Sequence, residues 1–294
     1  MHGACWHIDP AMMKGTRMSE RQNGLAEAYL YDAEIAYAVP GSEQIFYPSE
    51  RHRSRMPAES HHMPLYDMRA VRDRLSFDRN GFLLVERPTE AGDLRDPAQV
   101  ASHYLPEVER LVMELTGADK TICFGQMYRS DATGTTEGSQ PAFAAHVDYG
   151  DRTVRQFTRD ILGEEEAERW LRRRYMLINV WRPVVEVRRS PLALVDASTV
   201  RAEDLVVSEV RGGLGDPDRA TLYGYRLIHN PAHRWFHVPR MQPDEAMVFK
   251  LFDSDPDRVQ WTGHLAFNDP AAPPDAPPRE SIEVRTISFM PEGS

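Results

Sequence analysis

The sequence predicts a mainly β-sheet protein with a few flanking helices. Short segments rich in Val, Ile, Leu, Phe and Tyr recur along the chain, either alternating with polar residues or continuously apolar, as half-buried and fully buried strands do. Between them lie segments rich in Pro, Gly and Asp, which favour turns and loops. The expected strands cover residues 82–85, 121–129, 141–150, 175–184, 190–199, 222–228, 246–252, 261–267 and 279–290.

Helical periodicity is strongest in residues 96–115. Pro97 suits the first turn of a helix and Gly117 suits the position after its end, and the apolar stripe between them is expected to pack on the core. Residues 24–38 mix helix formers with tyrosines. Further helices are expected at residues 68–75, 152–162 and 164–175, and loops at residues 40–57, around His61 and His62, and in the polar, glycine-rich continuation at 201–219.

The residues from Pro141 to Gly150, PAFAAHVDYG, are the strongest candidate for chemistry. Side chains alternate along a strand, so His146 and Asp148 point to the same side. Their flanks are small and apolar, which makes a charged Asp148 costly unless it is paired or bound to a metal. An imidazole and a carboxylate on one strand face can take neighbouring positions on a metal ion. One more histidine would complete the two-histidine, one-carboxylate face of non-haem Fe(II) oxygenases.

The third ligand is best sought at His264, which lies on the short β-type segment 261–267. His233 and His237 are four residues apart, a spacing that would suit a metal on a helix. Pro231 and Pro239 bracket them too tightly for a stable helix. We therefore interpret both as structural or substrate-side histidines.

Arginines on the expected strands mark candidate binding positions. Arg279 and Ser281 share a face of the last strand with Glu283 and Arg285, and an arginine fork with a nearby hydroxyl suits the distal carboxylate of a dicarboxylate such as 2-oxoglutarate. The strand 175–184 places Asn179 and Trp181 on one face and Arg182 on the other. We assign Asn179, with Arg279 and Ser281, to cofactor binding, and Arg129, Trp181, Arg182 and Arg285 to substrate binding. A surplus of arginines predicts a substrate with a carboxylate or amino-acid-derived part.

Composition limits the classes of function. The formal net charge is −10 and the basic residues are scattered, so we expect no nucleic-acid partner. Neither Cys5 nor Cys123 belongs to a C-x-x-C pair, which excludes a zinc knuckle and fits a reducing cytoplasm. There is no apolar run of about 18 residues and no secretory leader pattern, so we expect a cytoplasmic protein without a membrane span. Residues 1–22 are expected to be a flexible tail, and residues 23–294 a single domain.

Several long motifs in order carry a resemblance to a known family. HVDYGDRTVRQF, LINVWRPV with SPLAL, NPAHRWFHVPRMQPDEAMVFKLFDSD, and GHLAF with RESIEVR make the chain similar to the gibberellin-desaturase-like family of Fe(II)/2-oxoglutarate oxygenases. That family includes fungal aspergillic-acid hydroxylase/desaturases and the P8 chain of cephalosporin 7α-methoxylase. The likeness runs from about Leu25 to Phe289.

The resemblance implies a double-stranded β-helix, or jelly-roll, of the cupin-like kind, with helices packed outside one sheet. It implies His146, Asp148 and His264 as iron ligands, with His229 and His237 as alternatives to His264. It also implies Arg279 with Ser281 as the 2-oxoglutarate clamp, with Arg285 as the competing arginine. Fe(II), 2-oxoglutarate and O2 would then serve hydroxylation, desaturation or cyclisation of a small natural-product or amino-acid-derived metabolite.

Two other functions stay open at this point. One is an isopenicillin-synthase-like Fe(II) oxidase that needs no 2-oxoglutarate, in which Arg279 and Ser281 hold a carboxylate of the substrate. The other is a jelly-roll protein that binds a metal or metabolite without turnover. Three protein ligands with an open coordination face favour an enzyme over a binding protein. The sequence does not predict an oligomeric state.

Overall fold

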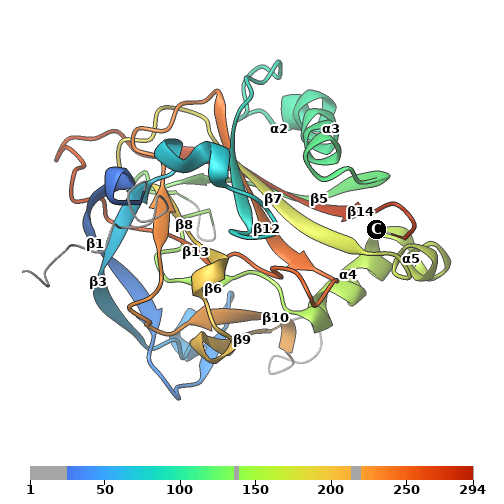
Figure 1. The fold of residues 1–294 in the computed structure, drawn as a ribbon, viewed down its shortest axis with the longest axis horizontal. Helices are drawn as coiled ribbons and strands as arrows, with labels where there is room; N and C mark the ends of the chain where they lie inside the picture. Colours follow the sequence, from blue (N-terminus) through green and yellow to red (C-terminus); the bar gives the residue numbers. More distant parts are fainter. Residues whose placement is uncertain (1–24, 136–138, 213–219, 294) are drawn as a thin grey trace, which may run out of the picture.

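The computed structural model describes residues 25–135, 139–212 and 220–293, and it consists mainly of two β-sheets (Figure 1). The larger sheet has nine strands in the order β1-β3-β11-β8-β13-β6-β10-β9-β2, and the smaller has five in the order β4-β12-β7-β14-β5. The predicted mainly β fold with flanking helices is confirmed. The expected tail at residues 1–22 lies outside the described residues, and the single domain at 23–294 stays a prediction.

The strand bounds define the two sheets. The larger sheet contains β1 (Tyr29–Ala38), β2 (Gln44–Phe46), β3 (Ala58–Asp67), β6 (His146–Val147), β8 (Leu192–Val195), β9 (Leu205–Arg211), β10 (Ala220–Leu227), β11 (Trp235–His237) and β13 (His264–Ala266). The smaller sheet contains β4 (Phe82–Glu86), β5 (Lys120–Ser130), β7 (Tyr175–Pro183), β12 (Glu245–Asp253) and β14 (Glu280–Phe289).

The helices cover the smaller sheet and one end of the molecule. They are α2 (Pro97–Gln99), the π-helical turn η4 (Val100–Tyr104), α3 (Leu105–Thr116), α4 (Asp151–Leu162) and α5 (Glu164–Trp170), with short 3₁₀ turns at Arg51–Arg53, Arg69–Arg74, Ala197–Thr199 and Ala202–Asp204. The predicted helix 96–115 therefore forms with a π-helical turn inside it. Asp96 caps its start by accepting a hydrogen bond from the backbone N–H of Ala98. Gly117 ends it in the left-handed conformation, at φ 71°.

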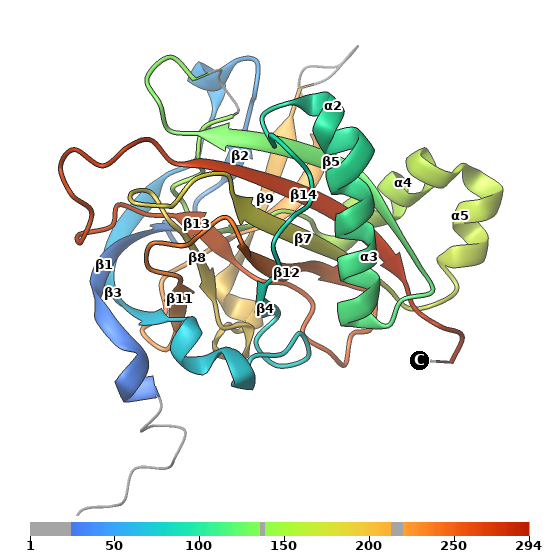
Figure 2. The same ribbon diagram turned by 90° about the horizontal axis from the view of Figure 1, so that it is seen from above.

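The smaller sheet is buried on both faces. Figure 2 shows α3 lying across β5, β14 and β7 on its outer side. Val108, Leu111 and Val112 of α3 pack there against a cluster that includes Val180 and Val284. The inner face packs against the larger sheet through a second cluster. Because apolar layers lie on both sides, every residue of β7 and β12 is buried, which explains why these two strands are nearly continuous apolar runs.

The larger sheet differs from the sequence-based expectation at its N-terminal edge. Residues 29–38 and 58–67 form an antiparallel pair, and the segment with His61 and His62 is a strand rather than a loop. Ile35 and Tyr37 point inward, into a third apolar cluster enclosed by the curled sheet. Residues 205–211, expected within a loop, form β9 and pair with β10. The expected strand 141–150 is reduced to His146–Val147 and an isolated bridge between Ala144 and Ala36.

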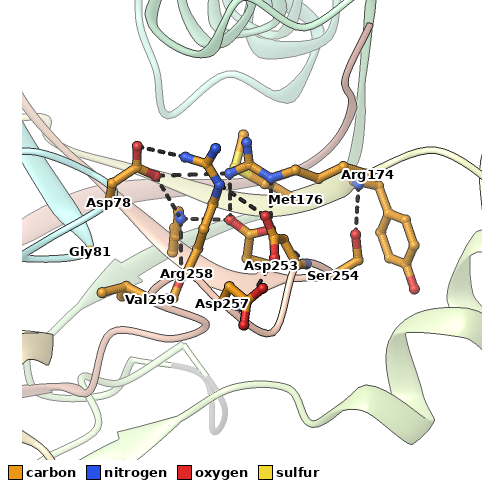
Figure 3. Close-up of polar contacts among 12 residues, drawn as sticks. Asp78, Gly81, Arg174, Met176, Asp253, Ser254, Asp257, Arg258 and Val259 are labelled. Atoms are coloured by element: carbon orange, nitrogen blue, oxygen red, sulfur yellow. Dashed lines mark hydrogen bonds and ion pairs between the residues drawn. The ribbon is translucent and has the colours of Figure 1, made fainter. Parts of the chain in front are cut away.

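A network of charged groups fixes one end of the smaller sheet (Figure 3). Lys250 is fully buried, and its Nζ donates to Asp253 Oδ2 at 2.6 Å and to the carbonyl of Val259 at 3.0 Å. Arg174 donates to both oxygens of Asp253. Burial alone would raise the pKa of Asp253, but the hydrogen bonds from Arg174 and Lys250 outweigh it and lower the pKa. The network ties the end of β12 to the start of β7 and to the loop before β13.

The fold brings the two sheets face to face around the predicted chemistry. In the larger sheet β13 lies next to β6, with His264 directly opposite His146. In the smaller sheet β14 lies between β7 and β5, with Arg285 opposite Asn179 and Ser281 opposite Arg129. No helix in the described part of the chain is long and apolar enough to cross a membrane.

Candidate metal centre and adjoining cavities

Three side chains converge at the centre of the larger sheet. Asp148 Oδ1 lies 3.4 Å from His146 Nε2 and 3.6 Å from His264 Nε2. One ligand atom from each of the three residues lies within 4.8 Å of those of the other two, and among the residues that the structure describes this is the only such group of three or more His, Cys, Asp or Glu. A metal with bonds of about 2.1 Å holds neighbouring ligand atoms roughly 3 Å apart. The separations therefore fit a single metal ion.

Backbone carbonyls fix the tautomers of both histidines. His146 Nδ1 lies 2.8 Å from the carbonyl oxygen of Ala144, and His264 Nδ1 lies 3.2 Å from that of Thr262. Because a carbonyl oxygen can only accept, each Nδ1 must carry the proton, and each Nε2 keeps a lone pair facing Asp148. Burial lowers the pKa of His264 to about 4, which favours the neutral, metal-binding form. A hydrogen bond from Nδ1 to a backbone carbonyl, as both histidines make here, is typical of metal-binding histidines.

A chain of buried charges holds Asp148 in its ionised form. Arg285 Nε donates to Asp148 Oδ2 at 3.2 Å and Arg285 Nη2 donates to Glu283 Oε1 at 2.6 Å. Arg129 forks onto both oxygens of Glu283, at 2.9 Å each. Burial alone would raise the pKa of Asp148, but Arg285, His146 and His264 together outweigh it and hold that pKa well below its usual value. Arg285 thus occupies one carboxylate oxygen and leaves Oδ1 facing the histidines.

A small inner cavity adjoins the three side chains on the side of the smaller sheet. Besides His146, Asp148 and His264, it is lined by Arg129, Ala142, Trp181, Leu192, Leu265, Ala266, Arg279, Glu283 and Arg285. Arg279 is 2% exposed, donates from Nη1 to the carbonyl of Ser190 at 2.8 Å, and lies 5.5 Å from the ring centroid of Trp181. Ser190 adopts φ 49°, a strained conformation for a residue other than glycine, which sites of binding often contain.

Three buried polar atoms of the smaller sheet and the residue before β14 lack a hydrogen-bond partner within the described residues, and of these only Arg279 lines the inner cavity. They are Arg279 Nε, Ser281 Oγ and Asn179 Oδ1. A buried unpaired donor costs about 1–3 kcal/mol, so such groups in a native protein call for a missing acceptor. Two donors belonging to an arginine and a serine fit a carboxylate. The two donors suit an anionic oxygen beside the metal position, whereas the cavity itself has a volume of only about 20 Å³ in this structure.

A larger outer pocket also adjoins the metal-binding group. Its volume is about 560 Å³ and its apolar lining includes Phe46, Met56, Phe143, Val210 and Leu222. It shares Arg129, Ala142, His146, Asp148 and Arg285 with the inner cavity. The outer pocket has the size and apolar character of a small-molecule site. A molecule bound in it would lie against His146 and Asp148.

One residue expected to bind substrate, Arg182, lies away from both cavities. Arg182 lies on the opposite face of β7 from Asn179 and Trp181, where it donates to the Tyr104 hydroxyl and to the carbonyls of Pro243 and Arg87. It is 2% exposed and its role is structural. The alternation of β7 already placed Arg182 and Trp181 on different faces, so they could not line one pocket.

The other expected binding residues lie at the site, with altered surroundings. Arg129 and Arg285 line both cavities but are held by Glu283 and Asp148, and Trp181 lines the inner cavity rather than the outer pocket. Asn179 is 1% exposed on the same face of β7 as Trp181. Glu283 shares a face of β14 with Arg285, and this spacing of two residues is consistent with the hydrogen bond between them.

The alternative histidines lie away from the metal-binding group. His237 Nε2 is 3.1 Å from the hydroxyl of Tyr31, and its buried ring packs edge-on against Phe267 of the third apolar cluster. His229 stacks on His61 with ring centroids 3.7 Å apart. His233 pairs with Asp204. The geometry therefore favours His264 over His229 and His237, and the interpretation of His233 and His237 as structural agrees with these contacts.

Comparison with known proteins identifies the class. The family model described as an oxidoreductase/YMDC permease-like domain matches residues 33–289. In a solved structure of the iron and α-ketoglutarate-dependent endoperoxidase NvfI, the fold matches with a TM-score of 0.81 at 28% identity, covering 89% of this chain and 98% of that one. The two-sheet fold is thus that of an Fe(II)/2-oxoglutarate oxygenase, with its jelly-roll core.

Curated relatives narrow the class to a family. The Fe(II)/2-oxoglutarate-dependent dioxygenase nvfI of Aspergillus novofumigatus is 34% identical over 78% of this chain and 83% of its own length. The α-ketoglutarate-dependent dioxygenase tstK of Talaromyces stipitatus is 31% identical over 76% and 83%. The hydroxylase/desaturase CTB9 of Cercospora beticola is 29% identical over 90% and 88%. The chain belongs to this family of Fe(II)/2-oxoglutarate-dependent oxygenases, which confirms the resemblance found in its motifs.

Proposed function

We propose that this Fe(II)/2-oxoglutarate-dependent oxygenase uses His146, Asp148 and His264 as its iron ligands and Arg279 with Ser281 as its 2-oxoglutarate clamp. The convergence of the three side chains beside two unpaired buried donors is the observation that supports the assignment most strongly. It also favours Arg279 over Arg285 as the clamp, because Arg285 is already paired with Asp148 and Glu283.

The roles of the chain's own residues follow from their contacts. Fe(II), when bound with 2-oxoglutarate and O2, supplies the oxidising power to attack an unactivated C–H bond. The carbonyls of Ala144 and Thr262 orient the Nε2 lone pairs of the two histidines. Arg285 fixes Asp148 so that one oxygen faces the metal position. Arg279 and Ser281 would bind the distal carboxylate, and the indole of Trp181 would form the wall beside it.

The outer pocket is the proposed site for the substrate. Its apolar lining and volume of about 560 Å³ suit a small metabolite, and it reaches His146 and Asp148. The relatives are named as dioxygenases and hydroxylase/desaturases, and a structural neighbour as an endoperoxidase. We propose hydroxylation, desaturation or cyclisation of a natural-product intermediate. A cytoplasmic location, and the absence of nucleic-acid and membrane partners, stay predictions.

Replacing the clamp arginine tests this proposal. Arg279→Leu removes a charge-assisted fork and would leave a buried carboxylate unpaired, at a cost of roughly 2–5 kcal/mol. At about 1.4 kcal/mol per decade, the affinity for 2-oxoglutarate is expected to fall at least tenfold. Anaerobic titration of the Fe(II)-loaded protein, followed by the visible charge-transfer band of chelated 2-oxoglutarate, measures this directly. Iron loading is expected to stay at the wild-type level, since Arg279 is not a ligand.

Arg182→Leu provides the matched control. It makes the same change of side chain in a neighbouring strand of the same sheet, on the face turned away from the inner cavity. It is expected to lower stability, because Arg182 makes buried hydrogen bonds, but to leave 2-oxoglutarate affinity of the folded protein unchanged. No band in the wild type would favour the oxidase or the binding protein. An unchanged affinity in Arg279→Leu would move the clamp to Arg285.

A further inference from the structure

The outer pocket contains a buried arginine that the proposed catalytic machinery does not use. Arg226 lies on β10 directly opposite His146 of β6 and is 4% exposed. Arg226 is one of the residues that line the outer pocket. Nε donates to the carbonyl oxygen of Ala145 at 3.1 Å, which directs the guanidinium along the strand that carries His146.

Arg226 differs from the other arginines of the pocket in its partners. Arg129 is forked onto Glu283, and Arg285 bridges Glu283 and Asp148. Arg51 lies near the ring of Phe46 and is exposed. No carboxylate among the described residues pairs with Arg226, and its Nη2 is buried without any hydrogen-bond partner. Asp148 and Glu283, the carboxylates of the pocket region, are thus paired with Arg129 and Arg285, and neither is paired with Arg226.

The physical cost of this arrangement points to a ligand. A buried charged group without an acceptor is strongly unfavourable, so buried arginines are nearly always paired. Burial lowers the pKa of Arg226 to about 10, which still leaves the guanidinium charged at neutral pH. No carboxylate in the described chain relieves this cost. The pocket wall therefore presents a cation whose natural partner is an anionic oxygen of a bound molecule.

We propose that Arg226 determines substrate specificity by binding a carboxylate on an otherwise apolar substrate in the outer pocket. This inference rests on the proposed function, because it takes the outer pocket to be the substrate site. The sequence predicted that Arg129, Arg182 or Arg285 would bind a carboxylate of the substrate, whereas Arg226 is the arginine proposed here. Because Arg226 lies opposite His146, a carboxylate held there anchors the substrate within a side chain's length of the metal position, and it fixes which carbon faces it.

Binding of matched probe pairs tests the proposal without knowledge of the substrate. Each pair consists of a bicyclic or tricyclic hydrocarbon bearing either a carboxylate or the carboxamide of the same shape, for example naphthalene-1-acetate and naphthalene-1-acetamide. Binding to the Fe(II)-loaded protein with saturating 2-oxoglutarate is measured anaerobically by calorimetry. We expect carboxylates to bind at least tenfold more tightly than their carboxamides, and this preference to vanish in Arg226→Gln. The carboxamides themselves are expected to bind both proteins alike.

Two further variants keep the outcome decisive. Arg51→Gln removes a charge of the same sign from an exposed position of the pocket and is expected to retain the preference. Arg226→Lys keeps the charge and is expected to retain part of it, so it serves if Arg226→Gln fails to fold. The proposal would be overturned if the preference for carboxylates persists in Arg226→Gln or is lost equally in Arg51→Gln. It would also be overturned if no probe pair shows the preference in the wild type. The charge-transfer band in the same samples reports the proposed function separately, so its failure is distinguishable.

Discussion

At the metal-binding group, each side chain has one polar atom facing the metal position and a second that is held by a hydrogen bond. His146 and His264 both donate Nδ1–H to a carbonyl two residues earlier, so the strand that carries each ligand also fixes its tautomer. The two oxygens of Asp148 differ in the same way: Oδ2 accepts a hydrogen bond from Arg285, and Oδ1 faces the histidines. The His-x-Asp spacing predicted that His146 and Asp148 share a side, and the two side chains do converge although the strand ends at Val147. It could not predict the ion pair with Arg285, which joins residues far apart in the chain.

A comparison of three histidine variants tests the ligand set. His146→Ala and His264→Ala are each expected to abolish stoichiometric iron binding and turnover, because each removes one of three protein ligands. His237→Gln is the control, since this buried histidine lies away from the metal-binding group and contacts Tyr31. It is expected to retain iron. Anaerobic Fe(II) titration with metal analysis after desalting measures the stoichiometry. Wild-type stoichiometry in His146→Ala would refute the central assignment.

At the level of elements, the sequence predicted best those segments whose own apolar pattern is long and regular. β7, β12 and β14 were predicted nearly to their bounds, and so was the helix that ends before Gly117. The strands β1 and β3 were missed. β1 contains helix formers such as Ala33 and Glu34, β3 contains Pro64, and their period-two burial depends on a sheet that curls back on itself. Partners distant in sequence decide such edges, and local preference cannot show them.

One glycine shows how an element positions the ligands. A Cβ on Gly224 of β10 would lie 2.5 Å from the carbonyl oxygen of Val147 and 2.8 Å from that of Asp148. These are backbone atoms of the segment that carries His146 and Asp148, so they cannot turn aside. Gly224→Ala is therefore expected to cost about 1–3 kcal/mol of stability through overpacking, and to weaken iron binding by displacing that segment.

Gly125→Ala is the matched control for this substitution. Gly125 lies on β5, and a Cβ there would meet nothing within 4 Å. Its replacement is expected to leave iron binding unchanged and stability equal or slightly raised. Chemical denaturation and Fe(II) titration of both variants give the comparison. Equal iron affinity in Gly224→Ala and the wild type would show that β10 does not set the position of the ligands.

At the level of the whole molecule, the proposed site divides its functions between the two sheets. The proposed iron ligands come from β6, β13 and the segment just after β6 in the larger sheet, whereas Arg279 lies immediately before β14 of the smaller sheet and Ser281 lies at its start. A 2-oxoglutarate bound to metal at one end and to Arg279 at the other would therefore connect the two sheets. Neither ligand alone makes both contacts, and this predicts that metal and 2-oxoglutarate stabilise the fold cooperatively.

Thermal unfolding with Mn(II) as a stand-in that does not react with O2 tests this cooperativity. A ligand that binds only the native state stabilises it by about 2.7 kcal/mol at 100 times its Kd. Mn(II) alone is expected to raise the unfolding midpoint, 2-oxoglutarate alone to leave it nearly unchanged, and the two together to raise it beyond the sum. Arg279→Leu is expected to keep the shift by Mn(II) and lose the additional one, because its defect lies in the smaller sheet. Strictly additive shifts in the wild type would mean that 2-oxoglutarate does not span the sheets, and the clamp would then have to be sought among residues on the same sheet as the metal ligands.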